Sequence, residues 1–123
     1  MNVDKIVSDL KKKYPDQDII IRKDDTSTEI IVEIEPSRDH PEKSLALAVV
    51  GISKLHYHKI STEIYEVLKG KLSLYIDGKK HILKQGEKIT ITPGQKHFAE
   101  GDEVWFLTRS TPGWTMEDHI FFT

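Results

Sequence analysis

The sequence contains no cysteine and carries no large excess of charge of one sign. Without cysteine, disulfide bonds and thiolate ligands are excluded, so a bound metal ion would have only nitrogen and oxygen donors. The formal net charge is −2, which provides no overall positive field for nucleic acid. The longest apolar run, residues 45–50, is far too short to cross a bilayer. We therefore expect no nucleic-acid partner and no membrane partner.

The composition is that of a folded chain. Hydrophobic residues make up 37% and charged residues 31% of 123 residues, which is typical of one soluble globular domain with a core of its own. The first fifteen residues lack the apolar core and the cleavage site of a signal peptide. We therefore expect a cytoplasmic location.

The N-terminal segment has the pattern of a short helix. Four apolar residues recur there at helical spacing: Val3, Ile6, Val7 and Leu10. Pro15 then interrupts the pattern. The apolar stripe is narrow, so the helix should need another surface to pack on. The sequence predicts a helical segment over residues 1–16 and a β-domain over residues 17–123.

From residue 18 onward the chain has the pattern of short strands separated by turns. β-branched residues dominate residues 19–21 and 28–34, and residues 71–76 alternate before Asp77-Gly78, a dipeptide typical of a type I′ hairpin. Further strand candidates cover residues 45–53, 79–84, 89–91, 103–109 and 119–122. Many short strands with regular turn residues predict an all-β sandwich or barrel.

Two histidines and a glutamate follow closely along the chain from residue 56. His56 and His58 are two apart, so on a strand both imidazoles point to the same side. Glu63 lies five residues after His58, and an odd separation would place it on the opposite face of one unbroken strand. The residues between them must therefore turn, bulge or change strands. If they do, Glu63 can face the histidines and Glu66 faces away, which favours Glu63 as the ligand.

A third histidine follows a second turn. Gly86 opens a predicted strand, Pro93-Gly94 reverses the chain, and His97 begins the next strand. A turn at this point could aim the His97 imidazole back into a barrel. A lone pair of histidines is weak support for a metal site, and a third histidine with a glutamate strengthens it considerably.

These two segments together resemble the motifs of the cupin superfamily. The first motif is matched by five residues: Gly51, His56, His58, Glu63 and Gly70. The second is matched by three: Gly86, Gly94 and His97. The chain departs from the pattern where four residues instead of five separate Gly51 from His56, where Thr92 replaces a proline, and where Gly101 replaces an asparagine.

The resemblance implies an all-β jelly-roll barrel, a double-stranded β-helix, with a short N-terminal helix. It also implies one divalent metal ion (iron, manganese, nickel or zinc) bound by His56, His58, Glu63 and His97. An octahedral ion with four protein ligands would keep two open positions, which suits a small oxygen-rich ligand or substrate. A dioxygenase is slightly favoured over a sugar isomerase or epimerase. The alternatives are a non-catalytic cupin that binds a carbohydrate or other small ligand, and an ion that only stabilises the fold.

Some residues and the assembly state remain open at this point. Tyr65 has the parity of Glu63 and could serve as a catalytic acid, base or hydrogen-bond donor, or be an ordinary strand aromatic. The roles of His40, His81 and His119 are undecided. A lone small barrel would leave strand edges unpaired, so we also predict a homodimer.

Overall fold

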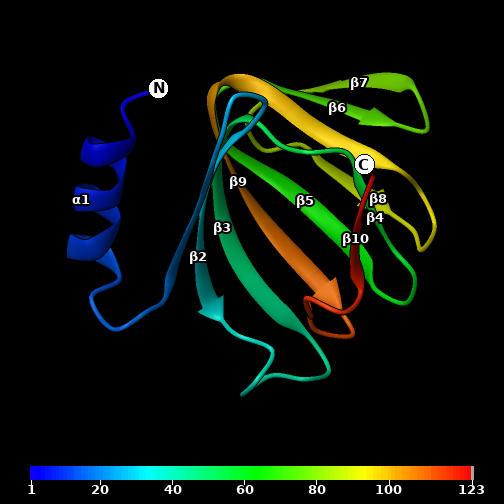
Figure 1. The fold of residues 1–123 in the computed structure, drawn as a ribbon, viewed down its shortest axis with the longest axis horizontal. Helices are drawn as coiled ribbons and strands as arrows, with labels where there is room; N and C mark the ends of the chain where they lie inside the picture. The colour runs from blue at the N-terminus through cyan, green and yellow to red at the C-terminus, as the bar shows by residue number, and fades with distance from the viewer. Residues whose placement is uncertain (123) are drawn as a thin grey trace.

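The fold is a curled antiparallel sheet with one helix outside it (Figure 1). The computed structural model describes residues 1–122, which form α1 (Val3–Lys13) and ten strands. The strands are β1 (Ile19–Lys23), β2 (Thr28–Glu35), β3 (Ser44–Ile52), β4 (His56–His58), β5 (Thr62–Lys69), β6 (Leu72–Ile76), β7 (Lys79–Leu83), β8 (Lys88–Ile91), β9 (His97–Thr111) and β10 (His119–Phe121). The predicted all-β jelly roll with an N-terminal helix is confirmed.

The long strand β9 holds the sheet together because it pairs with four other strands. Its residues 104–110 pair with β3 and its residues 105–111 with β5. At the other end, residues 97–100 pair with β6, and His97 also pairs with β4. Between these halves the backbone bends, and Glu103 has a positive φ of 56°. A Cβ on Gly101 would lie 2.8 Å from the Val104 side chain and 3.0 Å from the Lys71 carbonyl oxygen. A glycine at position 101 therefore lets the bend close.

The β6–β7 hairpin forms as its turn residues predict. Asp77 and Gly78 both have positive φ values, 50° and 82°, which is the backbone of a type I′ turn. The turn fixes the register of the two strands, from Ile76 opposite Lys79 to Leu72 opposite Leu83.

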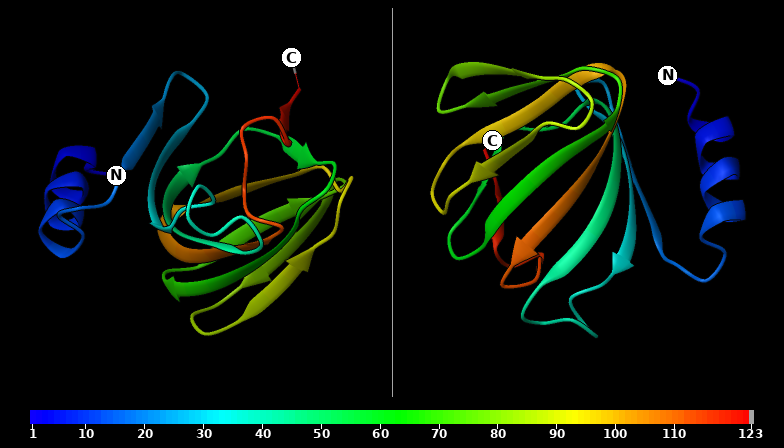
Figure 2. Two further views of the ribbon diagram at one scale, coloured as in Figure 1. Left: turned by 90° about the horizontal axis from the view of Figure 1, so that it is seen from below. Right: turned by 180° about the vertical axis from the view of Figure 1, so that it is seen from behind.

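Helix α1 packs against the outer face of the sheet (Figure 2). Its buried residues Ile6 and Leu10 contact outward-facing side chains of two strands: Ile30, Val32, Leu47 and Val49. Fully burying a side chain such as Leu10 contributes about 2 kcal/mol. Asn2 caps the helix, since its side chain accepts a hydrogen bond from the Lys5 backbone N–H at 3.1 Å. Among residues 1–122, no helix is long and apolar enough to cross a membrane.

The inner face of β2 is unusual because acidic side chains lie on it beside Ile31. With Ile30 and Val32 turned toward α1, the alternate residues Glu29 and Glu33 face the barrel interior. Ala46 of β3 lies opposite Glu33, and Ala48 lies opposite Ile31. Small alanines beside acidic side chains leave space, and a cavity forms there. This cavity extends to the side chains of β4, β5 and β10.

Candidate metal centre

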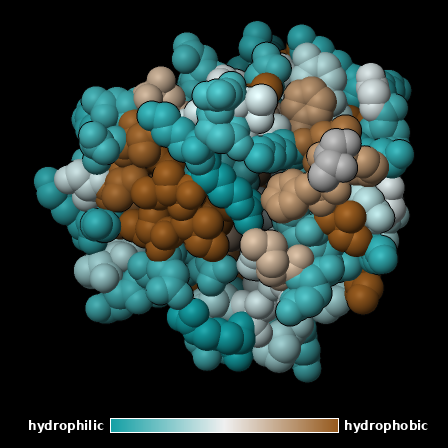
Figure 3. All heavy atoms as spheres, viewed as in Figure 1, coloured by the Kyte–Doolittle hydropathy of each residue, from teal (hydrophilic) through white to brown (hydrophobic). Residues whose placement is uncertain are grey.

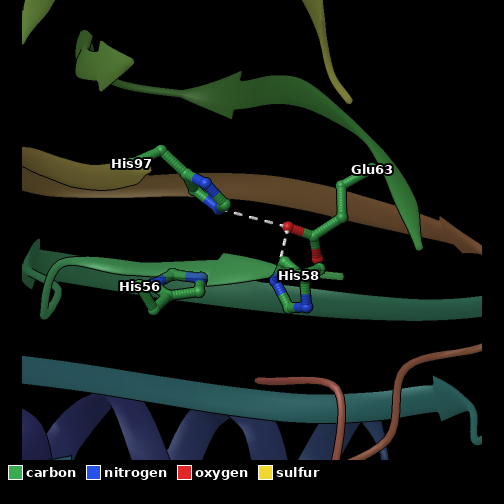
Figure 4. A group of neighbouring side chains, drawn as sticks. All are labelled: His56, His58, Glu63 and His97. Carbon is green, nitrogen blue, oxygen red and sulfur yellow. Dashed lines mark ion pairs between the residues drawn. The ribbon is translucent and has the colours of Figure 1, made fainter. Parts of the chain in front are cut away.

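Four side chains from three strands converge beside this cavity, which His56 and Glu63 line (Figure 4). His56 and His58 come from β4, Glu63 from β5, and His97 is the first residue of β9, paired in register with His56. All four are buried, and one donor atom from each lies within 4.8 Å of the others. The convergence predicted for these four residues is therefore present.

The chain turns between His58 and Glu63, as the odd separation requires. Asp118 holds this turn: its carboxylate accepts hydrogen bonds from the backbone N–H groups of residues 59, 60 and 61 at 2.9, 3.0 and 3.0 Å. Burial raises the pKa of Asp118, but the three N–H donors outweigh it and the net shift is downward. The ionised Asp118 therefore sets the direction in which the chain enters β5, and with it the position of Glu63.

The backbone also fixes the protonation of two imidazoles. His56 Nδ1 lies 2.8 Å from the Lys54 carbonyl oxygen, and His97 Nδ1 lies 2.9 Å from the Gln95 carbonyl oxygen. A carbonyl oxygen can only accept, so Nδ1 carries the proton in both neutral rings. The lone pair is then on Nε2, the atom available to a metal ion.

The donor atoms at the centre contact one another but make no hydrogen bonds within the described part of the chain. His58 Nε2, His97 Nε2 and Glu63 Oε1 are buried without a hydrogen bond among the described residues, although the two nitrogens lie only 3.1 and 3.3 Å from Oε1. Two donors that each lie about 2.1 Å from one ion are separated by about 3.0 to 3.4 Å in octahedral or tetrahedral geometry. These two spacings fit that range, so Glu63 Oε1, His58 Nε2 and His97 Nε2 are placed as donors to one divalent ion would be.

The electrostatics keep Glu63 ionised and His56 neutral, which are the forms of these two groups that bind cations. Burial raises the pKa of Glu63, but contacts with His58 and His97 outweigh it and hold the pKa well below its ordinary range. Burial lowers the pKa of His56 far below 6.5, and the nearby His97 and His119 lower it further. The pKa of His58 is lowered by burial but raised on balance by Glu63. At neutral pH the site therefore combines a carboxylate with neutral imidazole at His56.

Tyr65, the predicted catalytic residue, lines the cavity beside this centre. Its ring is buried and lies 4.7 Å from the Phe106 ring, centre to centre. Burial raises the pKa of Tyr65 well above 10, and the negative charges of Glu63 and Glu29 raise it further. Tyr65 therefore stays protonated near neutral pH and can donate a proton or hydrogen bond, but it is a poor base. Its catalytic role remains a prediction.

Two other cavity residues, Glu29 and Arg22, were not singled out from the sequence, and the role of His119 was left undecided there. Glu29 of β2 and Arg22 of β1 face each other across the strands, with Arg22 Nη1 3.6 Å from Glu29 Oε1. Burial raises the pKa of Glu29; Arg22 opposes this shift and Glu63 adds to it. His119 of β10 stacks on His56 with ring centres 4.0 Å apart. These residues reach the centre only through strand pairings between distant parts of the chain, so no short motif marks them.

Comparison with known proteins agrees with this architecture. The Cupin domain family matches residues 45–104. An uncharacterized protein of Aquifex aeolicus is 33% identical over 88 residues, which cover 71% of this chain and 72% of that protein. An uncharacterized protein of Methanocaldococcus jannaschii is 37% identical over 83 residues, covering 63% of this chain and 66% of that one.

Solved structures share the fold at low sequence identity. A variant of Streptomyces PAC13 with uridine superposes with a TM-score of 0.77 at 12% identity, covering 89% of this chain and 87% of that one. PAC13 is described as a nucleoside dehydratase. At this identity the similarity establishes a common barrel and carries no activity across.

Proposed function

Because this chain belongs to the cupin family, we propose that it binds one divalent ion at this centre and acts on a small oxygen-rich molecule. The observation that carries the proposal is the set of buried, unpaired donor atoms on His58, Glu63 and His97. Iron, manganese, nickel and zinc all accept nitrogen and oxygen donors of this kind. When bound, such an ion supplies Lewis-acid activation of an oxygen ligand.

The residues around the centre favour proton transfer. Glu29 is a second carboxylate in the cavity, 14% exposed at its side chain, and its raised pKa brings it closer to the range of a general acid or base. Arg22 beside it can hold the charged form, and protonated Tyr65 can donate to a developing oxyanion. We therefore place isomerase, epimerase or dehydratase chemistry ahead of the dioxygenase that the sequence slightly favoured.

Solvent deuterium exchange tests this proposal. Metal-loaded protein in D2O is expected to introduce deuterium next to the carbonyl of a hydroxy-ketone or sugar substrate, detected by NMR. Glu29→Gln should lower the exchange rate by about 100-fold, the usual contribution of a positioned acid or base. Glu100→Gln, which alters an exposed carboxylate on β9, is the matched control and should exchange as the parent does.

Three other results would each indicate a different function. Oxygen consumption without exchange would support a dioxygenase. Tight binding of an unchanged ligand, without exchange or oxygen consumption, would support the non-catalytic binding protein. A bound ion that accepts no further ligand would indicate that the ion only stabilises the fold.

We also propose that the protein forms a homodimer through the outer surface near α1. Apolar side chains gather between α1 and the sheet on the face shown in Figure 3. Ile21 on the edge strand β1 is 50% exposed, and β1 pairs only with β2 among the described strands. A second copy would cover both the apolar surface and the free edge.

Light scattering tests the dimer with a matched pair of variants. The parent is expected at twice the chain mass, and Ile21→Lys should shift it to the monomer, because a charge would be buried in the interface. Ile82→Lys changes an equally exposed isoleucine on β7, 53% exposed, and should stay dimeric. A monomeric parent at high concentration would contradict the proposal.

A further inference from the structure

A fourth imidazole, His119, lies against the centre without belonging to the four-ligand set. Its ring stacks on His56, with centres 4.0 Å apart and planes 9° from parallel, and meets His58 edge-on at 5.0 Å. β10 brings it there, since His119 pairs with His58 in the β4–β10 register. The residue is about nine-tenths buried and borders the cavity.

Trp114 determines which nitrogen of His119 carries the proton. The indole Nε1–H of Trp114 lies 2.9 Å from His119 Nδ1. An indole nitrogen only donates, so Nδ1 must accept, and the neutral ring carries its proton on Nε2.

The two ring nitrogens of His119 therefore have the opposite donor and acceptor roles to those of His56 and His97. His56 and His97 donate through Nδ1 to carbonyl oxygens and keep a lone pair on Nε2, whereas His119 accepts at Nδ1 and keeps a hydrogen on Nε2. That Nε2–H is buried and has no hydrogen-bond partner among residues 1–122. A buried donor left unpaired destabilises the folded protein, so an acceptor supplied by a ligand would recover that loss.

From this geometry we propose that His119 is a ligand-recognition residue whose Nε2–H donates to an oxygen of the molecule bound at the metal, with Trp114 as its positioning residue. The proposal rests on the proposed function, because it requires an ion at the centre. It narrows the substrate class to molecules with two neighbouring oxygens, such as hydroxy-acids or hydroxy-ketones. One oxygen would occupy the ion, and the other, anionic or carbonyl, would accept from His119.

Binding of a simple hydroxy-acid to nickel-loaded protein tests the donor role. With glycolate as the probe, followed by the nickel absorption spectrum, His119→Phe should weaken binding by about 10- to 100-fold, the range expected for a hydrogen bond to a charged group. His119→Gln retains an N–H donor and should recover most of the affinity. Imidazole, which offers no oxygen, is the control ligand and should bind parent and variants alike.

Two further measurements separate this inference from the proposed function. Nickel content should be equal in parent and His119→Phe; a loss would make His119 a metal ligand and overturn the inference. Ring nitrogen chemical shifts in zinc-loaded protein should show a protonated Nε2 and an unprotonated Nδ1 for His119, and Trp114→Phe should abolish that preference. Unchanged glycolate affinity in His119→Phe with full metal content would refute the inference while leaving the metal centre intact.

Discussion

Replacing His97 with alanine is expected to reduce the affinity for the divalent ion by at least about 100-fold. Loss of a residue that merely orients a ligand costs 10- to 100-fold, and His97 itself supplies a donor atom. Its side chain is fully buried, and its Nε2 lies 3.3 Å from Glu63 Oε1, so no other group can take its place without rearrangement. Competition with a fluorescent chelator measures the affinity directly.

The matched control for His97→Ala is His81→Ala, which removes an imidazole on β7 outside the four-residue cluster. That variant should bind the ion as the parent does. Metal-linked stability gives a second readout, since an ion present at 1,000 times its dissociation constant adds about 4 kcal/mol. Adding metal should therefore raise the melting temperature of the parent and of His81→Ala strongly, and that of His97→Ala very little. Equal metal affinity in all three proteins would exclude His97 as a ligand.

Replacing Asp118 with alanine is expected to lower the free energy of unfolding by about 3 kcal/mol. Three backbone N–H groups, those of residues 59 to 61, would lose an ionised acceptor together, and the bond from Ser61 is buried. The turn into β5 would loosen, so Glu63 would be held less firmly and metal affinity should fall as well. Urea denaturation and the chelator competition measure the two effects.

Glu87→Ala is the control for the Asp118 substitution. Glu87 also accepts a backbone N–H, that of Lys84 at 2.7 Å, but as a single bond at an exposed position. Its loss should cost no more than about 1 kcal/mol. If both variants lose equal stability, the three hydrogen bonds to Asp118 are not the source of the effect.

The contribution of Asp118 should also depend on pH. Its pKa is lowered in the folded state, so its stabilising effect is fully present above the unfolded pKa, near 4, and is lost as the pH falls through the folded value. The difference in unfolding free energy between parent and Asp118→Asn should therefore be constant from about pH 5 to 8 and shrink below about pH 4. A difference that grows toward acid pH would contradict the assigned charge state.

The four candidate ligands could be predicted from the sequence by strand spacing together with the resemblance to the cupin motifs. The two-residue spacing of His56 and His58 fixes one face, and the odd spacing to Glu63 demands a break. The cause of that break could not be predicted. Asp118 stabilises it from 57 or more residues away, and no local pattern indicates a contact at that separation.

The contents of the cavity were less predictable than its ligands. The alternation in β2 shows that Ile30 and Val32 share one face and Glu29 and Glu33 the other, but it does not say which face is inside. Helix α1 decides this, because it covers the face with Ile30 and Val32 from outside the barrel. The position of His119 beside the centre could not be predicted either, because it depends on a three-residue pairing between β10 and β4.

The most direct test is elemental analysis of the protein purified without chelators or added metal. The geometry predicts close to one equivalent of a single divalent ion per chain, bound by three imidazoles and one carboxylate and lost on chelation. Protein that contains no ion, and that takes up neither iron, manganese, nickel nor zinc when each is offered, would contradict the assignment of His56, His58, Glu63 and His97 as a metal centre.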